Sequence, residues 1–129
     1  MFSSDAVTRN IRVQVQVEYS PDRSRPADQH WFFFYTITIS NEGEETVQLL
    51  TRHWIITDGN NHVEEVRGPG VVGEYPVLRR GQMFTYTSGC GLSTPFGMMQ
   101  GTYQMTTEAG TKFDAVIAPF ALSEPYTVH

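Results

Sequence analysis

A chain of 129 residues, 40% hydrophobic and 18% charged, is long enough to bury a core and is most simply one domain over residues 1–129, ordered over about residues 10–122. The formal net charge of −5, with nine basic residues, argues against a general binder of the nucleic-acid phosphate backbone. A single cysteine cannot form an intramolecular disulfide, and the sequence shows no signal segment and no long apolar run. We therefore expect a cytoplasmic protein without a membrane segment.

Alternating apolar and polar residues indicate β-strands, beginning with residues 11–19, where Ile, Val and Tyr alternate with Arg, Gln and Glu. No window shows the spacing of an amphipathic helix. The pattern predicts seven strands, over residues 11–19, 31–40, 46–57, 62–67, 82–88, 102–108 and 112–120. Such closely spaced strands are typical of an all-β antiparallel sandwich. Residues 69–78 and 91–101 are then long connections, and residues 123–129 are a tail.

One local pattern points to an immunoglobulin-like sandwich. Residues 101–105 read GTYQM, which places Tyr103 two residues before Met105, where antibody domains carry a core cysteine on a late strand. Trp54, on the third predicted strand, is then the core tryptophan opposite it. We expect these three side chains to form part of the structural core, and an exposed Trp54 would contradict the assignment.

The residues Asp58-Gly59-Asn60-Asn61 predict a hairpin turn between the third and fourth strands. A loop of two or four residues would place Ile56 opposite Val63 and Arg52 opposite Arg67. Facing like charges destabilise a strand pair, so that register would require an acidic or anionic neighbour. Arg52 and Arg67 are therefore candidate anion ligands.

Gly68, Gly70 and Gly73 form a GxGxxG pattern, which in dinucleotide-binding proteins follows a strand and opens a helix. Here Pro76 lies where the second turn of that helix would begin, and Pro69 lacks one of the amides that would face an anion. We therefore favour glycines that serve a turn. A weaker alternative stays open, in which exposed amides bind a phosphate or nucleotide together with Arg52 and Arg67.

The histidines and the cysteine lack the spacing of known metal or catalytic motifs. His53 and His62 could converge across the hairpin as a two-histidine metal site, but a structural hydrogen bond beside Trp54 is the favoured role of His53. The small neighbours of Cys90 would expose a nucleophile, but no histidine base is indicated, which favours a passive loop thiol. The glutamates, among them Glu64, are expected on solvated edges. The sequence thus predicts no enzyme and no cofactor.

Five apolar residues lie in segments that read as loops: Val71, Val72, Phe96, Met98 and Met99. They either fold back into the core, which we favour, or form an adaptable contact surface. Loops gathered at one end of a sandwich are frequent recognition sites.

Several ordered segments give the chain a resemblance to the ApaG family, from about Ile11 to Leu122. The segments that carry it are SNEG (40–43), TRHWIITDGN (51–60), EEVRGPGVVGEYPVL (64–78), FTYTSGCGLSTPFGMMQGTYQM (84–105) and FDAVIAPFAL (113–122). The resemblance implies a bacterial protein with a fibronectin type III-like or immunoglobulin-like sandwich, and a genetic link to cobalt resistance and magnesium efflux. The gene for such a protein often lies beside that for diadenosine tetraphosphate hydrolase. Related domains occur in F-box proteins and in a protein that interacts with DNA polymerase delta, which implies protein–protein contact. The family has no established catalytic residues to carry over.

Together these observations predict a non-catalytic binding module that recognises a partner protein through its loops and one sheet face. Two alternatives remain: a small-anion or nucleotide sensor at the GxGxxG loop, and a divalent-metal binder that uses His53, His62 or Glu64. A homodimer formed through an edge strand also stays open.

Overall fold

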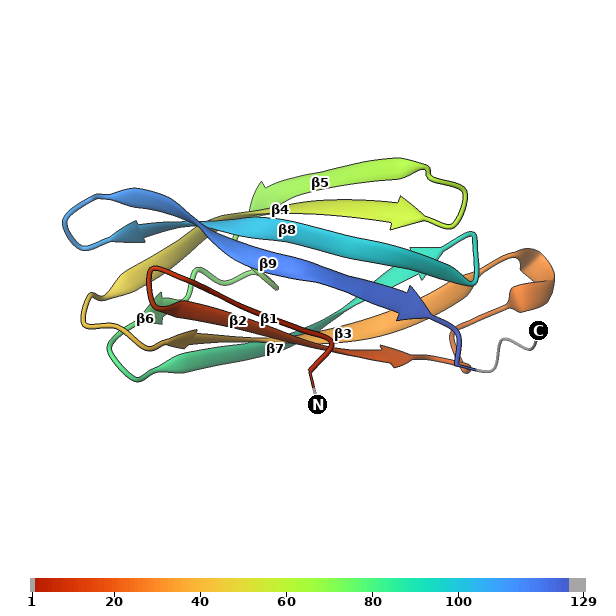
Figure 1. The fold of residues 1–129 in the computed structure, drawn as a ribbon, viewed down its shortest axis with the longest axis horizontal. Coiled ribbons are helices and arrows are strands. Elements are labelled where there is room, and N and C mark those ends of the chain that lie inside the picture. Colours follow the sequence, from red (N-terminus) through yellow and green to blue (C-terminus); the bar gives the residue numbers. More distant parts are fainter. Residues whose placement is uncertain (1, 126–129) are drawn as a thin grey trace.

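Nine strands form because β-branched and aromatic residues recur with a period of two along most of the chain. The computed structural model describes residues 2–125 and arranges these strands in two packed antiparallel sheets, which confirms the β-sandwich (Figure 1). The strands are β1 (Ser4–Thr8), β2 (Ile11–Tyr19), β3 (Trp31–Asn41), β4 (Val47–Asp58), β5 (Val63–Pro69), β6 (Val77–Leu78), β7 (Met83–Leu92), β8 (Phe96–Thr107) and β9 (Lys112–Ser123). A short 3-10 helix, η1 (Pro26–Asp28), precedes β3.

The order of the strands leaves the sandwich closed on one side and open on the other. One sheet has the order β1-β2-β3-β7 and the second has the order β5-β4-β8-β9, with β6 paired to β4. On the closed side β1 and β2 lie against β9, and the backbone amide of Val116 donates to Oγ1 of Thr8 at 3.1 Å (Figure 1). On the other side each sheet ends in an edge strand, β7 or β5.

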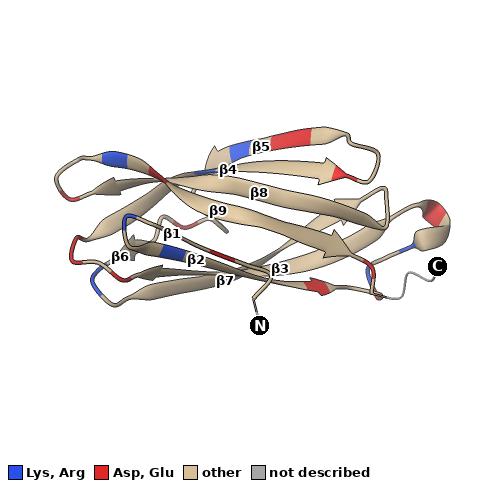
Figure 2. Cartoon of the chain, viewed as in Figure 1, with Lys and Arg blue, Asp and Glu red and all other residues tan. Residues whose placement is uncertain are grey.

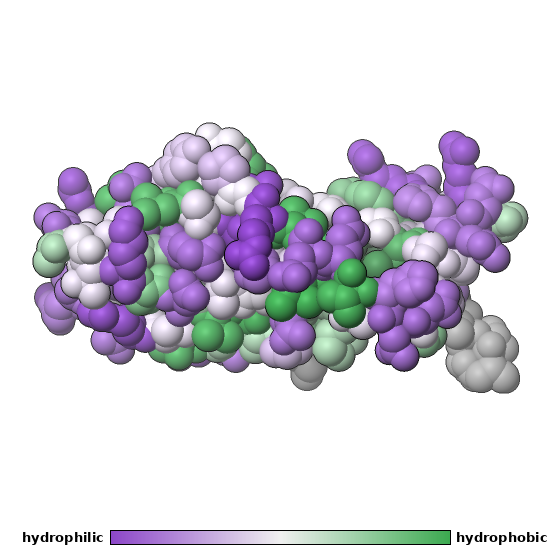
Figure 3. Space-filling model, turned by 90° about the horizontal axis from the view of Figure 1, so that it is seen from above, coloured by the Kyte–Doolittle hydropathy of each residue, from purple (hydrophilic) through white to green (hydrophobic). Residues whose placement is uncertain are grey.

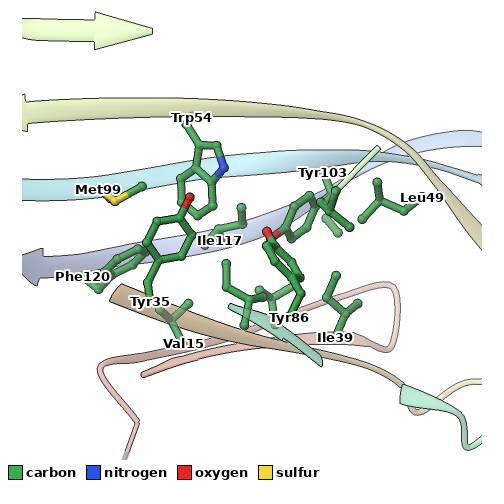
Figure 4. Packing of buried hydrophobic residues seen from close by; sticks show 14 of the residues in the cluster. Val15, Tyr35, Ile39, Leu49, Trp54, Tyr86, Met99, Tyr103, Ile117 and Phe120 are labelled. Atoms are coloured by element: carbon green, nitrogen blue, oxygen red, sulfur yellow. The ribbon is translucent and has the colours of Figure 1, made fainter. Parts of the chain in front are cut away.

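The core fills the space between the inner faces of the sheets (Figure 4). Trp54 is 3% exposed, and Tyr103 and Met105 are fully buried. The ring of Trp54 lies edge-on to the rings of Tyr35, at 5.4 Å between centroids, and of Phe120, at 6.0 Å. Burying each of these large side chains contributes roughly 1.5–3 kcal/mol, so the aromatic cluster is a main source of stability.

The prediction that residues 91–101 form a long connection is wrong. Strands β7 and β8 run through this segment, and only residues 93–95 join them. Its glycines are strand residues that admit close neighbours: a Cβ on Gly101 would lie 2.1 Å from the carbonyl oxygen of His53. Met99 packs in the core, whereas Met98 and Phe96 are exposed, so the apolar residues of this segment divide between the two predicted roles. Val71 and Val72 divide in the same way, with Val71 buried and Val72 exposed.

The ends of the chain also differ from the prediction. Strand β1 lies before the predicted start of the ordered core and pairs with β2 from Ser4 to Thr8. At the other end, the carboxylate of Glu124 accepts hydrogen bonds from the hydroxyl of Tyr19 at 3.1 Å and from Nε1 of Trp31 at 3.2 Å. The predicted tail thus begins later than residue 123, and residues 126–129, which include His129, lie outside the described residues. Within residues 2–125 there is no helix long and apolar enough to cross a membrane.

Candidate functional site

The hairpin of β4 and β5 sets the positions of most predicted site residues, and its register differs from the predicted one. Arg52 pairs with Gly68 and His53 pairs with Arg67, so the predicted pairing of Arg52 with Arg67 is wrong. The reason is a loop of three residues: Asp58 and His62 close the turn, and Asn61 adopts a left-handed conformation with φ 65°. Compared with a loop of two or four residues, a loop of three residues shifts the pairing of β4 with β5 by one residue. This shift places Arg52 and Arg67 on opposite faces of the sheet.

Arg52 contacts the glycine motif by donating hydrogen bonds to backbone carbonyl oxygens of the loop. Its Nη1 atom donates to the carbonyl oxygens of Pro69 at 2.8 Å and Gly70 at 2.9 Å. The guanidinium lies over Gly68, where a Cβ would be 2.8 Å from Nη2. The first glycine therefore makes room for the arginine, and the arginine holds the backbone of the loop.

The rest of the glycine motif forms a tight turn with no helix after it. Val72, with φ 43°, and Gly73, with φ 79°, occupy the two central positions of a turn closed by hydrogen bonds in both directions between Val71 and Glu74. The amide of Gly70 donates to the carbonyl oxygen of Leu50 at 2.9 Å. The amides of Gly70, Val71 and Glu74 are thus already engaged within the protein, which leaves a weaker anion site than the sequence pattern suggests.

The two candidate metal-binding histidines are not brought together. His53, on the outer face of its sheet, lies with Nε2 at 2.7 Å from Oε1 of Glu65. His62 lies at the hairpin turn, with Nδ1 at 3.9 Å from Oδ2 of Asp58. Among residues 2–125, no three or more His, Cys, Asp or Glu side chains are grouped closely enough to hold a metal ion.

Cys90 points inward from β7 and is buried, so the prediction of a loop thiol is wrong about its place. Burial, and to a smaller extent the charge of Glu64, raise the pKa of the Cys90 thiol to about 11. Catalytic cysteines are activated by the opposite shift, which lowers the pKa of the thiol. At neutral pH this thiol is protonated.

A feature that the sequence did not reveal is a cleft of about 380 Å³ between the two open edges of the sandwich. Its floor consists of core side chains and its rim carries one charge of each sign, Arg52 and Glu64. Residues that line it are Tyr35, Arg52, Trp54, Ile56, Glu64, Val66, Ser88, Gly89, Cys90, Gly91 and Met99. These residues come from five strands in two sheets, so only the tertiary structure brings them together.

The most distinctive surface of the molecule is the edge formed by β7. Figure 2 shows that β3, β7 and β8 carry no Lys, Arg, Asp or Glu along their length. The other three edge strands are protected in ways known to prevent unwanted pairing. Strand β5 carries three charges and a proline, β9 carries Lys112, Asp114 and Pro119, and β1 has only five residues. Strand β7 spans ten residues with neither a charge nor a proline.

The outer face beside this edge is polar but uncharged. Threonine hydroxyls pair across β3 and β7, Thr36 with Thr87 at 2.8 Å and Thr38 with Thr85 at 3.2 Å. Farther along, the ring of Phe32 covers Gly89, where a Cβ would lie 2.3 Å from Cζ, which explains glycine in this strand. On the opposite side of the molecule, which carries β5, β4 and β8 (Figure 1) and is seen from above in Figure 3, the hydrophobic residues form small separate patches among hydrophilic ones.

Comparisons with known proteins add the following. Residues 21–107 match the family model described as the ApaG domain. The chain is 54% identical over 120 residues to Protein ApaG of Rhodopseudomonas palustris (strain TIE-1), which covers 93% of this chain and 92% of that protein. It is 52% identical over 126 residues to Protein ApaG of Dechloromonas aromatica (strain RCB), with 98% and 99% covered. The crystal structure of the putative ApaA protein from Bordetella pertussis is similar, with a TM-score of 0.89 and 47% identity over 95% of this chain and 100% of that one.

Proposed function

Because the chain belongs to the ApaG domain family, we propose that it is a non-catalytic binding module that recognises a partner protein through the edge strand β7. The partner is a protein rather than a nucleic acid or a membrane. In this proposal the family's link to cobalt resistance and magnesium efflux is exercised through the partner, and the chain itself works without a cofactor in the cytoplasm.

The observation that carries the proposal is the unprotected edge of β7. Among residues 2–125, β3 is the only strand that pairs with β7. The free side of an edge strand presents backbone donors and acceptors that another chain can pair with, and soluble proteins usually block it with charges, prolines, bulges or a short length. Blocking features occur on β1, β5 and β9 and are missing from β7. Of the four edge strands among residues 2–125, β7 alone lacks these features, which favours a role for β7 in binding.

The face beside β7 supports the same assignment. A partner that pairs with β7 would extend over threonine pairs that present hydroxyls and no charge, so it would meet no like-charge repulsion there. At the far end of β3 the guanidinium of Arg23 lies 5.4 Å from the ring centroid of Phe34, which adds a contact point of the kind enriched at interfaces.

Binding of a small anion or nucleotide by Gly68, Gly70 and Gly73 with Arg52 and Arg67 is the less supported proposal. The arginines lie on opposite faces of the sheet, and loop amides and Arg52 donors are engaged with the loop's own backbone. An anion would have to displace these internal hydrogen bonds, or use the remaining donors of the loop.

Site-specific photo-crosslinking in living cells tests the proposed function. A photoreactive phenylalanine analogue replaces Thr87 on the edge strand, with matched positions at Gln14 on β2 of the same face and Gln100 on β8 of the other sheet. We expect a defined adduct with one different protein at position 87 and none at positions 14 and 100. Equal labelling at all three positions, or an adduct only with a second copy of this chain, would contradict the proposal.

A further inference from the structure

We infer that the groove between β7 and β5 binds an extended peptide segment of the partner, which pairs with β7 as an added strand and places alternate side chains between the two sheets. This inference rests on the proposed function and deepens it, because it names the form in which the partner is recognised. The inter-sheet groove is defined here by the inner sides of residues 88–93 of the chain, by β4 from Arg52 to Asp58, and by β5 from Glu64 to Val66.

The space in this groove is continuous and has the shape of a strand. The cleft of about 380 Å³ adjoins a second hollow of about 350 Å³, and Ile56, Glu64 and Gly91 line both. The first hollow meets residues 88–91 and the second meets residues 91–93, so the groove follows the C-terminal half of β7. Six residues of a strand extend over roughly 20 Å, which suits a short extended segment.

The floor of the groove favours apolar side chains. Trp54 and Met99 form it, at 3% and 1% exposure, and Tyr35 lies beside them at 6% (Figure 4). Half-buried Ile56 and Val66 form the wall on the side of β5. Because alternate side chains of a strand point to the same side, every second residue of an added strand would contact this floor, while the others face solvent.

The charge in the groove specifies one feature of the peptide. Within residues 2–125 the structure gives the carboxylate of Glu64 no hydrogen bond or ion pair, whereas its neighbour Glu65 on the opposite face contacts His53 and Arg67. The charge of Glu64 reaches the groove, since it contributes to the raised pKa of Cys90. A peptide with a lysine or arginine opposite Glu64 would supply the missing partner, and Asp58 lines the same end of the groove.

A displayed library of random peptides of about ten residues, selected against the full chain, supplies the probe. We expect enriched peptides to alternate apolar with polar residues and to carry a lysine or arginine. Glu64→Lys should weaken a selected synthetic peptide about ten-fold or more, while Glu65→Lys, the same change one residue along on the opposite face, should alter affinity less than about two-fold. Hydrogen exchange of the amides in residues 88–92 should slow when the peptide binds.

Three results would overturn the inference. The first is that no peptides are enriched. The second is that the selected peptides bind equally well to Glu64→Lys and protect amides outside β7. The third is that the free chain sediments as a dimer with β7 already protected, which would assign the groove to a second copy. If the first or second result occurred while Thr87 still crosslinked a partner protein, the proposed function would stand and only the inter-sheet groove would be excluded as its site.

Discussion

The hydroxyl groups of Tyr86 and Tyr103 hydrogen-bond to each other at 2.5 Å and join the two sheets through the core (Figure 4). Tyr103 occupies the position at which immunoglobulin-like domains direct a tyrosine hydroxyl to the backbone upstream. Here the hydroxyl meets a second tyrosine, from β7, instead. Burial raises the pKa of both residues, so both hydroxyls stay protonated at neutral pH and one donates to the other.

Removing both of these hydroxyls should destabilise the fold less than the sum of the losses from removing each one alone. Tyr86→Phe or Tyr103→Phe leaves the remaining buried hydroxyl without its partner, and each should lower the free energy of unfolding by about 1–3 kcal/mol. The double variant leaves no unpaired hydroxyl and should be less destabilised than the sum of the single ones. Urea unfolding of the four proteins measures this, and strictly additive losses would contradict the coupling.

Two glycines of the GxGxxG pattern should respond differently to alanine. Gly70 has φ 59° and a Cβ there would lie 2.4 Å from the carbonyl oxygen of Glu74, so Gly70→Ala should destabilise by about 2 kcal/mol or more. Gly73 has φ 79° but open space around it, so Gly73→Ala should lower the free energy of unfolding by only about 1 kcal/mol. Thermal unfolding compares the two. A larger loss at Gly73 would show that the turn geometry is described wrongly.

The thiol of Cys90 should make stability fall in alkaline solution. Its pKa rises from an ordinary value of 9.0 to about 11 in the fold, so above pH 9 the unfolded chain loses this proton before the native protein does. The stabilisation is complete below pH 9 and is lost as the pH rises to about 11. The comparison is with Cys90→Ser, which lacks the thiol and whose stability should fall less steeply over this window. Parallel curves for the two proteins would contradict the assignment.

Pyrophosphate should leave the glycine loop unchanged. The amides of Gly70, Val71 and Glu74 already donate to carbonyl oxygens, and Pro69 has no amide hydrogen. In an amide NMR titration with pyrophosphate, ATP and diadenosine tetraphosphate, we expect no saturable shift at residues 68–74 at millimolar concentration. Saturable shifts confined to this loop and to the side chain of Arg52 would favour the anion sensor over the protein-binding module.

The sequence predicted those parts of the fold that depend on local pattern. Alternation placed β2 at residues 11–19 as observed, and the tryptophan and tyrosine positions identified Trp54 and Tyr103 as residues that the structure buries. Family resemblance agreed with the comparisons, which show an ApaG domain.

The candidate site depends on features that pattern does not reveal. The residues Asp58-Gly59-Asn60-Asn61 predict a loop of two or four residues, whereas the structure has a turn of three residues in which Asn61 is left-handed. This difference places Arg67 on the opposite face of the sheet from Arg52. Gly97 and Gly101 read as loop residues although they are strand positions that admit close neighbours. The inter-sheet groove joins residues from distant strands, and the free edge of β7 follows from the order of strands in the sheet, so both required the tertiary structure.

The most direct measurement is the affinity of the partner identified by crosslinking for two lysine variants, Thr87→Lys and Thr36→Lys. The two residues share one hydrogen bond, so each variant breaks the same 2.8 Å contact and adds the same charge to the same face. They differ in that Thr87 lies on the edge strand and Thr36 lies one strand inward. We predict that Thr87→Lys weakens binding about ten-fold or more and that Thr36→Lys changes it less than about two-fold. Equal effects of the two variants, or no effect of either, would contradict recognition at the β7 edge.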